Sequence, residues 1–154
     1  MSVPSRKSPR LSGYDYQTSN YYFLTICTHH HKCIFGTPGE LNHLGRIAAN
    51  DLMNIPAIHP GVKIDKFVVM PNHIHVIMVI SNPADCPSIP QMIASYKTGV
   101  TKQIRSICPG LTVWQRSFYD HIIRNEADYQ SIWQYVSGNP SKWLEDQFYV
   151  KNSV

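Results

Sequence analysis

Residues 62–80, VKIDKFVVMPNHIHVIMVI, carry the clearest structural signal in the chain. Two runs within them, 62–70 and 74–80, are rich in β-branched and aromatic residues, as is typical of strands. Pro71-Asn72 between the runs is a turn signal, so the whole stretch predicts a β-hairpin. The second run is apolar at nearly every position, which predicts a central strand covered on at least one face.

The segments on either side extend the hairpin into a pattern of strands and helices. The predicted elements are a strand at Tyr21–Ile26, a helix after an Asn42 N-cap that Pro56 ends, a helix over Ser88–Ile107, a fourth strand within Val113–Ile123 beginning at Val113, a helix from Asn125 to near Gly138, and a short helix at 141–146. If the hairpin is counted as one unit, the first five units are strand, helix, hairpin, helix and strand, which gives the order β-α-β-β-α-β. This order predicts an α+β, ferredoxin-like fold, one antiparallel sheet with helices on one face, followed by a C-terminal helix.

The chain has 154 residues, which is enough for one domain with its own core, so we expect a single domain over 1–154. Residues 1–19 are polar and predict an extended basic arm, because Arg6, Lys7 and Arg10 precede the first acid. Fourteen Lys and Arg against ten Asp and Glu give a charge of +4, which favours an anionic partner. We expect a cytoplasmic protein, associated with the nucleoid through DNA, since no stretch has the pattern of a membrane span or a secretory signal.

His73 and His75 are the sharpest candidates for chemistry. Residues i and i+2 of a strand point to the same face, so both imidazoles should lie side by side while Ile74 points to the other face. Two histidines at this spacing can share one divalent metal ion, although a hairpin could also begin with two histidines by chance. A histidine-triad nucleotide hydrolase is excluded, because the third histidine it needs is replaced by Ile77.

Tyr135 and Asn139 form a second candidate pair, four residues apart and therefore on one face of the last predicted long helix. Taken alone, a tyrosine there is ordinarily a residue at the edge of the core with its hydroxyl in water. An amide next to Pro140 is ordinarily a helix-end cap.

Two polar clusters remain. The stretch His29-His30-His31 lacks the paired spacing of zinc ligands and predicts a polar loop tip. Asp120-His121, followed by Arg124, lies near the end of the fourth predicted strand and could either orient a helix or contact a phosphate.

Basic and aromatic side chains occur close together in two parts of the chain. Residues 86–119 contain no acid but four basic residues, and the N-terminal arm places its basic residues near Tyr14 and Tyr16. Such an arrangement suits a single nucleic-acid strand whose bases can stack, and a merely solvated helix face is the alternative.

Six segments form one ordered set along nearly the whole chain: RKSPRL (6–11), GYDY (13–16), YFLTICT (22–28), VVMPNHIH (68–75), WQRSFYDHIIR (114–124) and YVSGNP (135–140). This ordered set resembles the REP-associated tyrosine transposases, within the HUH single-strand DNA transposases.

The resemblance implies a ferredoxin-like, usually dimeric enzyme that cleaves and rejoins single-stranded DNA near palindromic, REP-like hairpins, with Mg²⁺ or Mn²⁺ as cofactor. At the matching positions, His73 and His75 would be metal ligands and Asn139 the third protein ligand. Tyr135 would be the nucleophile that forms a 5′-phosphotyrosine, with Tyr119 as the competing tyrosine. The residues expected to contact DNA are Arg6, Lys7, Arg10, Lys97, Lys102, Arg105, Arg116 and Arg124.

Two other functions fit the same residues. One is a catalytically silent hairpin-DNA binding or regulatory protein derived from a transposase. The other is a metal-dependent phosphoesterase that uses water as its nucleophile. The sequence is also compatible with Tyr135 serving either its own protomer or a partner.

Overall fold

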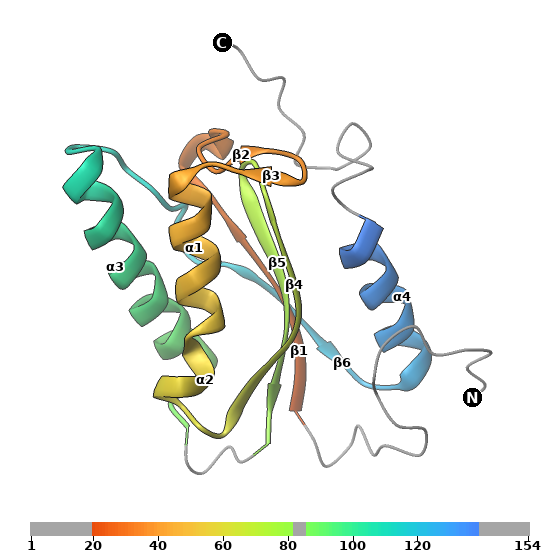
Figure 1. Cartoon of the computed structure of the whole chain (residues 1–154). Coiled ribbons are helices and arrows are strands. Elements are labelled where there is room, and N and C mark those ends of the chain that lie inside the picture. The colour runs from red at the N-terminus through yellow and green to blue at the C-terminus, as the bar shows by residue number, and fades with distance from the viewer. Residues whose placement is uncertain (1–19, 82–85, 139–154) are drawn as a thin grey trace.

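The computed structural model describes residues 20–81 and 86–138, which fold around one antiparallel sheet of four strands in the order β4-β5-β1-β6. Two long helices cover one face of the sheet and the last helix lies on the opposite face (Figure 1). The strands are β1 (Asn20–Cys27), β4 (Val62–Met70), β5 (His73–Ile80) and β6 (Tyr119–Ile123), and the helices are α1 (His43–Met53), α3 (Ile89–Ile107) and α4 (Glu126–Gly138). The predicted ferredoxin-like fold is therefore confirmed.

Smaller elements account for most differences from the predicted pattern. A 3-10 turn, η1 (His29–His31), and a short hairpin of β2 (Gly36–Thr37) and β3 (Glu40–Leu41) follow β1. The prediction that Pro56 ends the first helix was wrong, because α1 ends at Met53 and Pro56 lies in the first turn of α2 (Ile55–Ile58). Proline is tolerated there, since the first turn of a helix has no intrahelical acceptor for its N–H.

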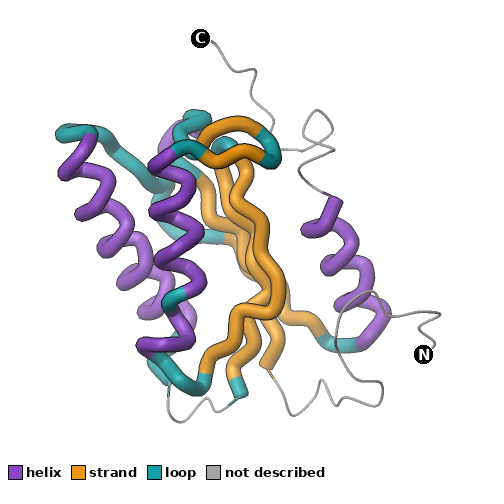
Figure 2. The backbone as a smooth tube through the Cα atoms, in the orientation of Figure 1, coloured by secondary structure: helices purple, strands orange, loops and turns teal. Residues whose placement is uncertain are grey.

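The fourth strand also begins later than predicted, at Tyr119 rather than Val113, and Trp114 forms only an isolated bridge to Thr28. The predicted helix at 141–146 and the arm at 1–19 lie outside the described residues. Figure 2 shows the four-stranded sheet as one layer with α1 and α3 on one side and α4 on the other. None of the helices in the described part of the chain is both long enough and apolar enough to span a bilayer.

Side-chain caps set where the helices begin. Asn42 Oδ1 accepts the backbone N–H of Gly45 at 2.8 Å, as predicted for the N-cap of α1. At α3, the Ser88 hydroxyl accepts the N–H of Gln91, and the Gln91 side chain accepts the N–H of Ser88. This reciprocal pair is a capping box, which satisfies two backbone donors at the helix start.

Gly45 allows α1 to pack closely against the chain that precedes it. A Cβ at this position would lie 2.3 Å from the carbonyl oxygen of Phe35, and backbone cannot move away cheaply.

We expect Gly45→Ala to lower the free energy of unfolding by about 1–3 kcal/mol. Gly99→Ala in α3 is the control, because its Cβ would meet only the Asp51 carboxylate at 3.5 Å. That change should stabilise the protein by roughly 0.5–1 kcal/mol, since alanine favours helix over glycine. Urea unfolding measures both, and a Gly45→Ala variant as stable as the parent would contradict the close approach.

Each face of the sheet carries its own apolar core. The larger core lies beneath α1 and α3 and includes Leu24 of β1 and Ile74 of β5. The smaller core lies beneath α4 and joins Tyr21, Ile77 and Tyr129 with a few neighbours. Odd-numbered residues of β1 and β5 therefore face α4, and this is the face that carries the candidate site.

A β-bulge in β4 provides the groups that hold α4. The register shifts between Ile64 and Lys66, so that Asp65 is the extra residue. The Asp65 carboxylate accepts a hydrogen bond from the hydroxyl of Tyr129, and the Lys66 ammonium lies 4.5 Å from the centre of the Trp133 ring. Both contacts attach α4 to the outer strand of the sheet.

Candidate active site

His73 and His75 lie side by side on the face of β5 beneath α4. Their ring centres are 4.6 Å apart, and neither residue is more than 1% exposed. Ile74 between them packs into the larger core on the other face. The structure thus shows the placement that strand alternation predicts.

Each imidazole is held through its Nδ1 atom. The Nδ1 of His75 lies 2.9 Å from the hydroxyl of Thr25, its cross-strand neighbour on β1. The Nδ1 of His73 lies 2.8 Å from the side-chain oxygen of Asn72. Histidines that bind metals are commonly oriented by a hydrogen bond through the ring nitrogen that does not bind the metal. A metal ion would therefore bind this pair through the two Nε2 atoms.

Tyr135 of α4 packs against the same pair. Its ring centre lies 5.2 Å from that of His75 and 6.3 Å from that of Phe23 on β1. The Phe23 ring is in turn 5.2 Å from His75. Because Tyr135 is 41% exposed, a large substrate can reach it while it contacts the buried imidazole. The fold thus brings a hairpin residue and a distant helix residue together within one chain.

Three contacts set the position of α4 over this face. Tyr129 and Trp133 contact β4 through the bulge, and His121 Nε2 of β6 lies 2.7 Å from the Asp128 carboxylate of α4. Of the two roles considered for the polar cluster at the end of β6, the structure therefore shows helix orientation for His121. The His121 side chain is 51% exposed, so this contact contributes little to stability.

Sequence reasoning missed Asp65, although a signal for it exists. The residues of β4 that face the larger core are Val62 and Ile64 before the bulge, and Phe67 and Val69 after it. Their numbers change from even to odd, which is the pattern that one inserted residue produces in a strand. Reading that change would have identified the bulge.

The backbone of Tyr119, the competing tyrosine, lies two strands away from that of His75. Tyr119 pairs with Thr25 and so shares the face of the imidazoles, but β1 separates β6 from β5. Two strand spacings correspond to about 9–10 Å. Asn139, the expected third ligand, directly follows the last residue of α4 and lies outside the described residues.

Among residues 20–81 and 86–138, no cluster of three or more His, Cys, Asp or Glu side chains is arranged for a metal ion. The expected ligand set contains only two residues of those types, His73 and His75, because its third member is an amide.

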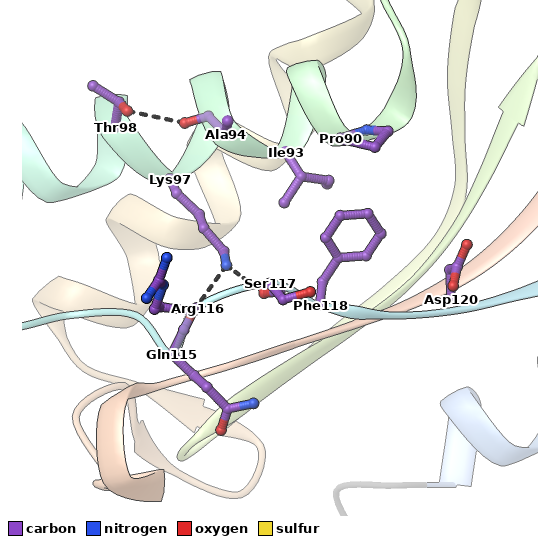
Figure 3. Close-up of a pocket in the computed structure, with 10 residues that line it drawn as sticks. All are labelled: Pro90, Ile93, Ala94, Lys97, Thr98, Gln115, Arg116, Ser117, Phe118 and Asp120. Carbon is purple, nitrogen blue, oxygen red and sulfur yellow. Dashed lines mark hydrogen bonds between the residues drawn. The ribbon is translucent and has the colours of Figure 1, made fainter.

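Basic residues line two adjoining pockets beside α3. The first, of about 640 Å³, is drawn in Figure 3 and contains Arg116, and the second, of about 430 Å³, contains Lys102 and Arg105. Lys97 lines both, and its ammonium donates hydrogen bonds to the carbonyl oxygens of Gln115 and Ser117. Burial lowers the pKa of Lys97. Through its two hydrogen bonds, Lys97 stabilises the segment before β6.

The remaining expected DNA contacts divide into two groups. Lys102, Arg105, Arg116 and Arg124 are exposed. Arg6, Lys7 and Arg10 lie outside the described residues.

The loop that contains His29–His31, here called the histidine loop, contacts Asn72 beside the imidazole pair through its backbone. His30 and His31 of η1 both have a left-handed φ of 53°, which is uncommon for residues with a side chain. The rings of His29 and His30 lie 3.9 Å apart. The carbonyl oxygen of His31 accepts a hydrogen bond from the side-chain amide of Asn72 at 3.1 Å.

Comparisons with known proteins place the chain among transposases. The family model described as "Transposase IS200 like" matches residues 16–139. An uncharacterised protein of Haemophilus influenzae is 36% identical over 171 residues, covering 96% of this chain and 95% of that protein. A REP-associated tyrosine transposase of Escherichia coli strain K12 is 31% identical over 85 residues, covering 54% of this chain and 48% of that protein.

A solved structure shows the same fold. It is that of a REP-associated tyrosine transposase bound to a REP hairpin, with a TM-score of 0.59 and 23% identity over 92% of this chain and 74% of that chain. The family resemblance drawn from the sequence is thus confirmed. The chain belongs to the IS200-like transposase family.

Proposed function

We propose that this protein is a metal-dependent transposase that cleaves and rejoins single-stranded DNA near palindromic hairpins, through a 5′-phosphotyrosine on Tyr135. The observation that carries the proposal is the 5.2 Å contact between the rings of Tyr135 and His75. Family membership and the REP hairpin bound to a structural relative support DNA as the partner. Because both rings belong to one chain, no second copy is needed to bring Tyr135 to the imidazoles.

The donor groups fit a divalent metal ion. His73 and His75 would hold it through Nε2, and Asn139 would add an amide oxygen. Mg²⁺ and Mn²⁺ both prefer oxygen ligands, and Mn²⁺ is the softer of the two and accepts imidazole nitrogen more readily. Such an ion, when bound, neutralises charge on the scissile phosphate and orients it.

The covalent step falls to Tyr135. Its hydroxyl oxygen attacks the phosphorus, a new P–O bond forms, and the bond to the 3′ oxygen breaks. The phenol loses its proton and the leaving 3′ oxygen gains one. The 5′ phosphate stays on Tyr135, which conserves the bond energy for strand transfer. Since a phenol is largely protonated at neutral pH, its proton must be removed during the attack.

Exposed cations beside α3 suit the DNA backbone. We expect a Lys102→Ala, Arg105→Ala double variant to bind a labelled hairpin more weakly. Its slope of log affinity against log salt should be shallower by about 0.9 for each duplex phosphate that the variant no longer neutralises. Fluorescence anisotropy over a salt series measures this, with Lys63→Ala as the control because Lys63 is an exposed lysine of β4. An unchanged affinity and slope in the double variant would remove these residues from the DNA-binding surface.

A covalent adduct is the direct test of the proposal. The protein is incubated with hairpin-flanked single-stranded DNA and Mn²⁺, then denatured and separated by electrophoresis. We expect DNA that stays attached to the protein. Affinity without cleavage would show a binding or regulatory protein. Cleavage without an adduct would show a phosphoesterase that uses water, and either outcome contradicts the proposal.

A further inference from the structure

Asn72 lies between the histidine loop and the imidazole pair and contacts both. It is fully buried, and its side-chain nitrogen donates to the carbonyl oxygen of His31 at 3.1 Å. Its side-chain oxygen lies 2.8 Å from Nδ1 of His73. Its own carbonyl oxygen accepts the backbone N–H of Thr28 at 3.0 Å and the Thr28 hydroxyl at 3.1 Å. These contacts hold the amide in one position.

The contacts also decide which way the amide points. A backbone carbonyl can only accept a hydrogen bond, so the Asn72 atom that faces His31 must be the nitrogen. The reverse orientation would place two oxygens against each other. The side-chain oxygen of Asn72 therefore faces His73, and an amide oxygen can only accept. It follows that Nδ1 of His73 must carry a proton.

A neutral imidazole carries one proton, so a proton on Nδ1 leaves the lone pair of His73 on Nε2. We propose that Asn72 is a positioning residue, which fixes this tautomer of His73 and so makes Nε2 the nitrogen available to a metal ion. The part that concerns metal binding rests on the proposed function, whereas the tautomer itself does not.

Thr25 does not provide the same control over His75. A hydroxyl can donate or accept, so the contact between Thr25 and His75 is compatible with either tautomer. Of the two contacts to the imidazole Nδ1 atoms, only the one from Asn72 determines where the proton lies. The residue before His73 therefore does more than form a turn.

The histidine loop provides the carbonyl oxygen that orients the Asn72 amide. The left-handed conformation of His30 and His31 places the His31 carbonyl within reach of Asn72. The same Thr28 hydroxyl lies 2.8 Å from the carbonyl oxygen of Lys32, so its single hydrogen is shared between the Lys32 and Asn72 carbonyls. The histidine loop thus contacts the site through the backbone oxygen of His31. Left-handed backbone conformations such as those of His30 and His31 occur often near functional sites.

Nitrogen NMR of metal-free protein labelled with ¹⁵N-histidine tests the tautomer directly. The spectra are recorded well above the usual histidine pKa of about 6.5, and a His73→Gln variant assigns the signals. We expect the His73 signals to show a proton on Nδ1. A proton on Nε2 overturns the proposal without any measurement of activity.

Two variants test the role of Asn72. Asn72→Ala removes the acceptor, so the His73 proton should distribute between both nitrogens while the His75 signals stay unchanged. Mn²⁺ affinity, measured by calorimetry, should fall about 10–100-fold. Asn72→Asp keeps an oxygen toward His73, but it also places an oxygen against the His31 carbonyl, so it should lose the contact with the histidine loop. An unchanged tautomer in Asn72→Ala overturns the assignment.

The outcomes separate this inference from the proposed function. If the adduct experiment fails while His73 carries its proton on Nδ1, the transposase chemistry is wrong and the tautomer assignment stands. If the adduct forms while the proton lies on Nε2, the tautomer assignment is wrong and the transposase chemistry stands.

Discussion

Tyr135→Phe is expected to abolish the covalent adduct and to slow strand cleavage by at least about 10³-fold, because loss of a covalent nucleophile removes most of the catalysis. The change deletes only the hydroxyl oxygen. The ring can keep its contacts with His75 and Phe23, so the site should stay packed and DNA affinity should not change. Adduct formation, single-turnover cleavage and anisotropy on the same hairpin substrate measure the three quantities.

Tyr119→Phe is the matched control. Tyr119 lies on the same face of the sheet and is 55% exposed, but it is two strands away from the imidazoles. Its variant should therefore form the adduct at the parent rate. An adduct that persists in Tyr135→Phe and is lost in Tyr119→Phe would transfer the nucleophile to Tyr119.

His73→Ala should lower Mn²⁺-dependent cleavage by about 10²-fold or more, since it removes one of two imidazole donors for an ion that stabilises charge by several kcal/mol. His73 is fully buried, so truncation also opens a cavity, and circular dichroism must show that the variant is folded. His43→Ala is the control, because His43 is exposed at the start of α1. Cleavage that follows Mn²⁺ concentration as in the parent would remove His73 from the metal site.

The fold could be predicted to the level of element order, and the local errors have physical causes. Val113 and Trp114 have side chains that favour strands, yet the chain does not join the sheet until Tyr119. Lys97 binds two carbonyls of this segment, and Ser117 adopts a left-handed φ of 66°. Tertiary contacts thus override the local preference, and short-range patterns do not contain that information.

One part of the candidate site could likewise be predicted from local sequence, and the other part could not. Alternation along β5 was enough to pair His73 with His75, because that relation is local. The approach of Tyr135 could be inferred only through the family resemblance, since it depends on contacts that α4 makes with Asp65 and Lys66 in another part of the chain. Asn72 was interpreted as a turn residue, because its second role requires a carbonyl from the histidine loop.

The unequal cores on the two sides of the sheet have a consequence for motion. Resistance to local opening increases with the apolar surface that an element buries, and among residues 20–81 and 86–138 the core beneath α4 is the smaller of the two. The helix that carries the phenol can therefore detach at a lower free-energy cost than the whole domain needs to unfold. Substitutions in the core beneath α4 should therefore change the mobility of Tyr135 more than they change the free energy of unfolding of the whole domain.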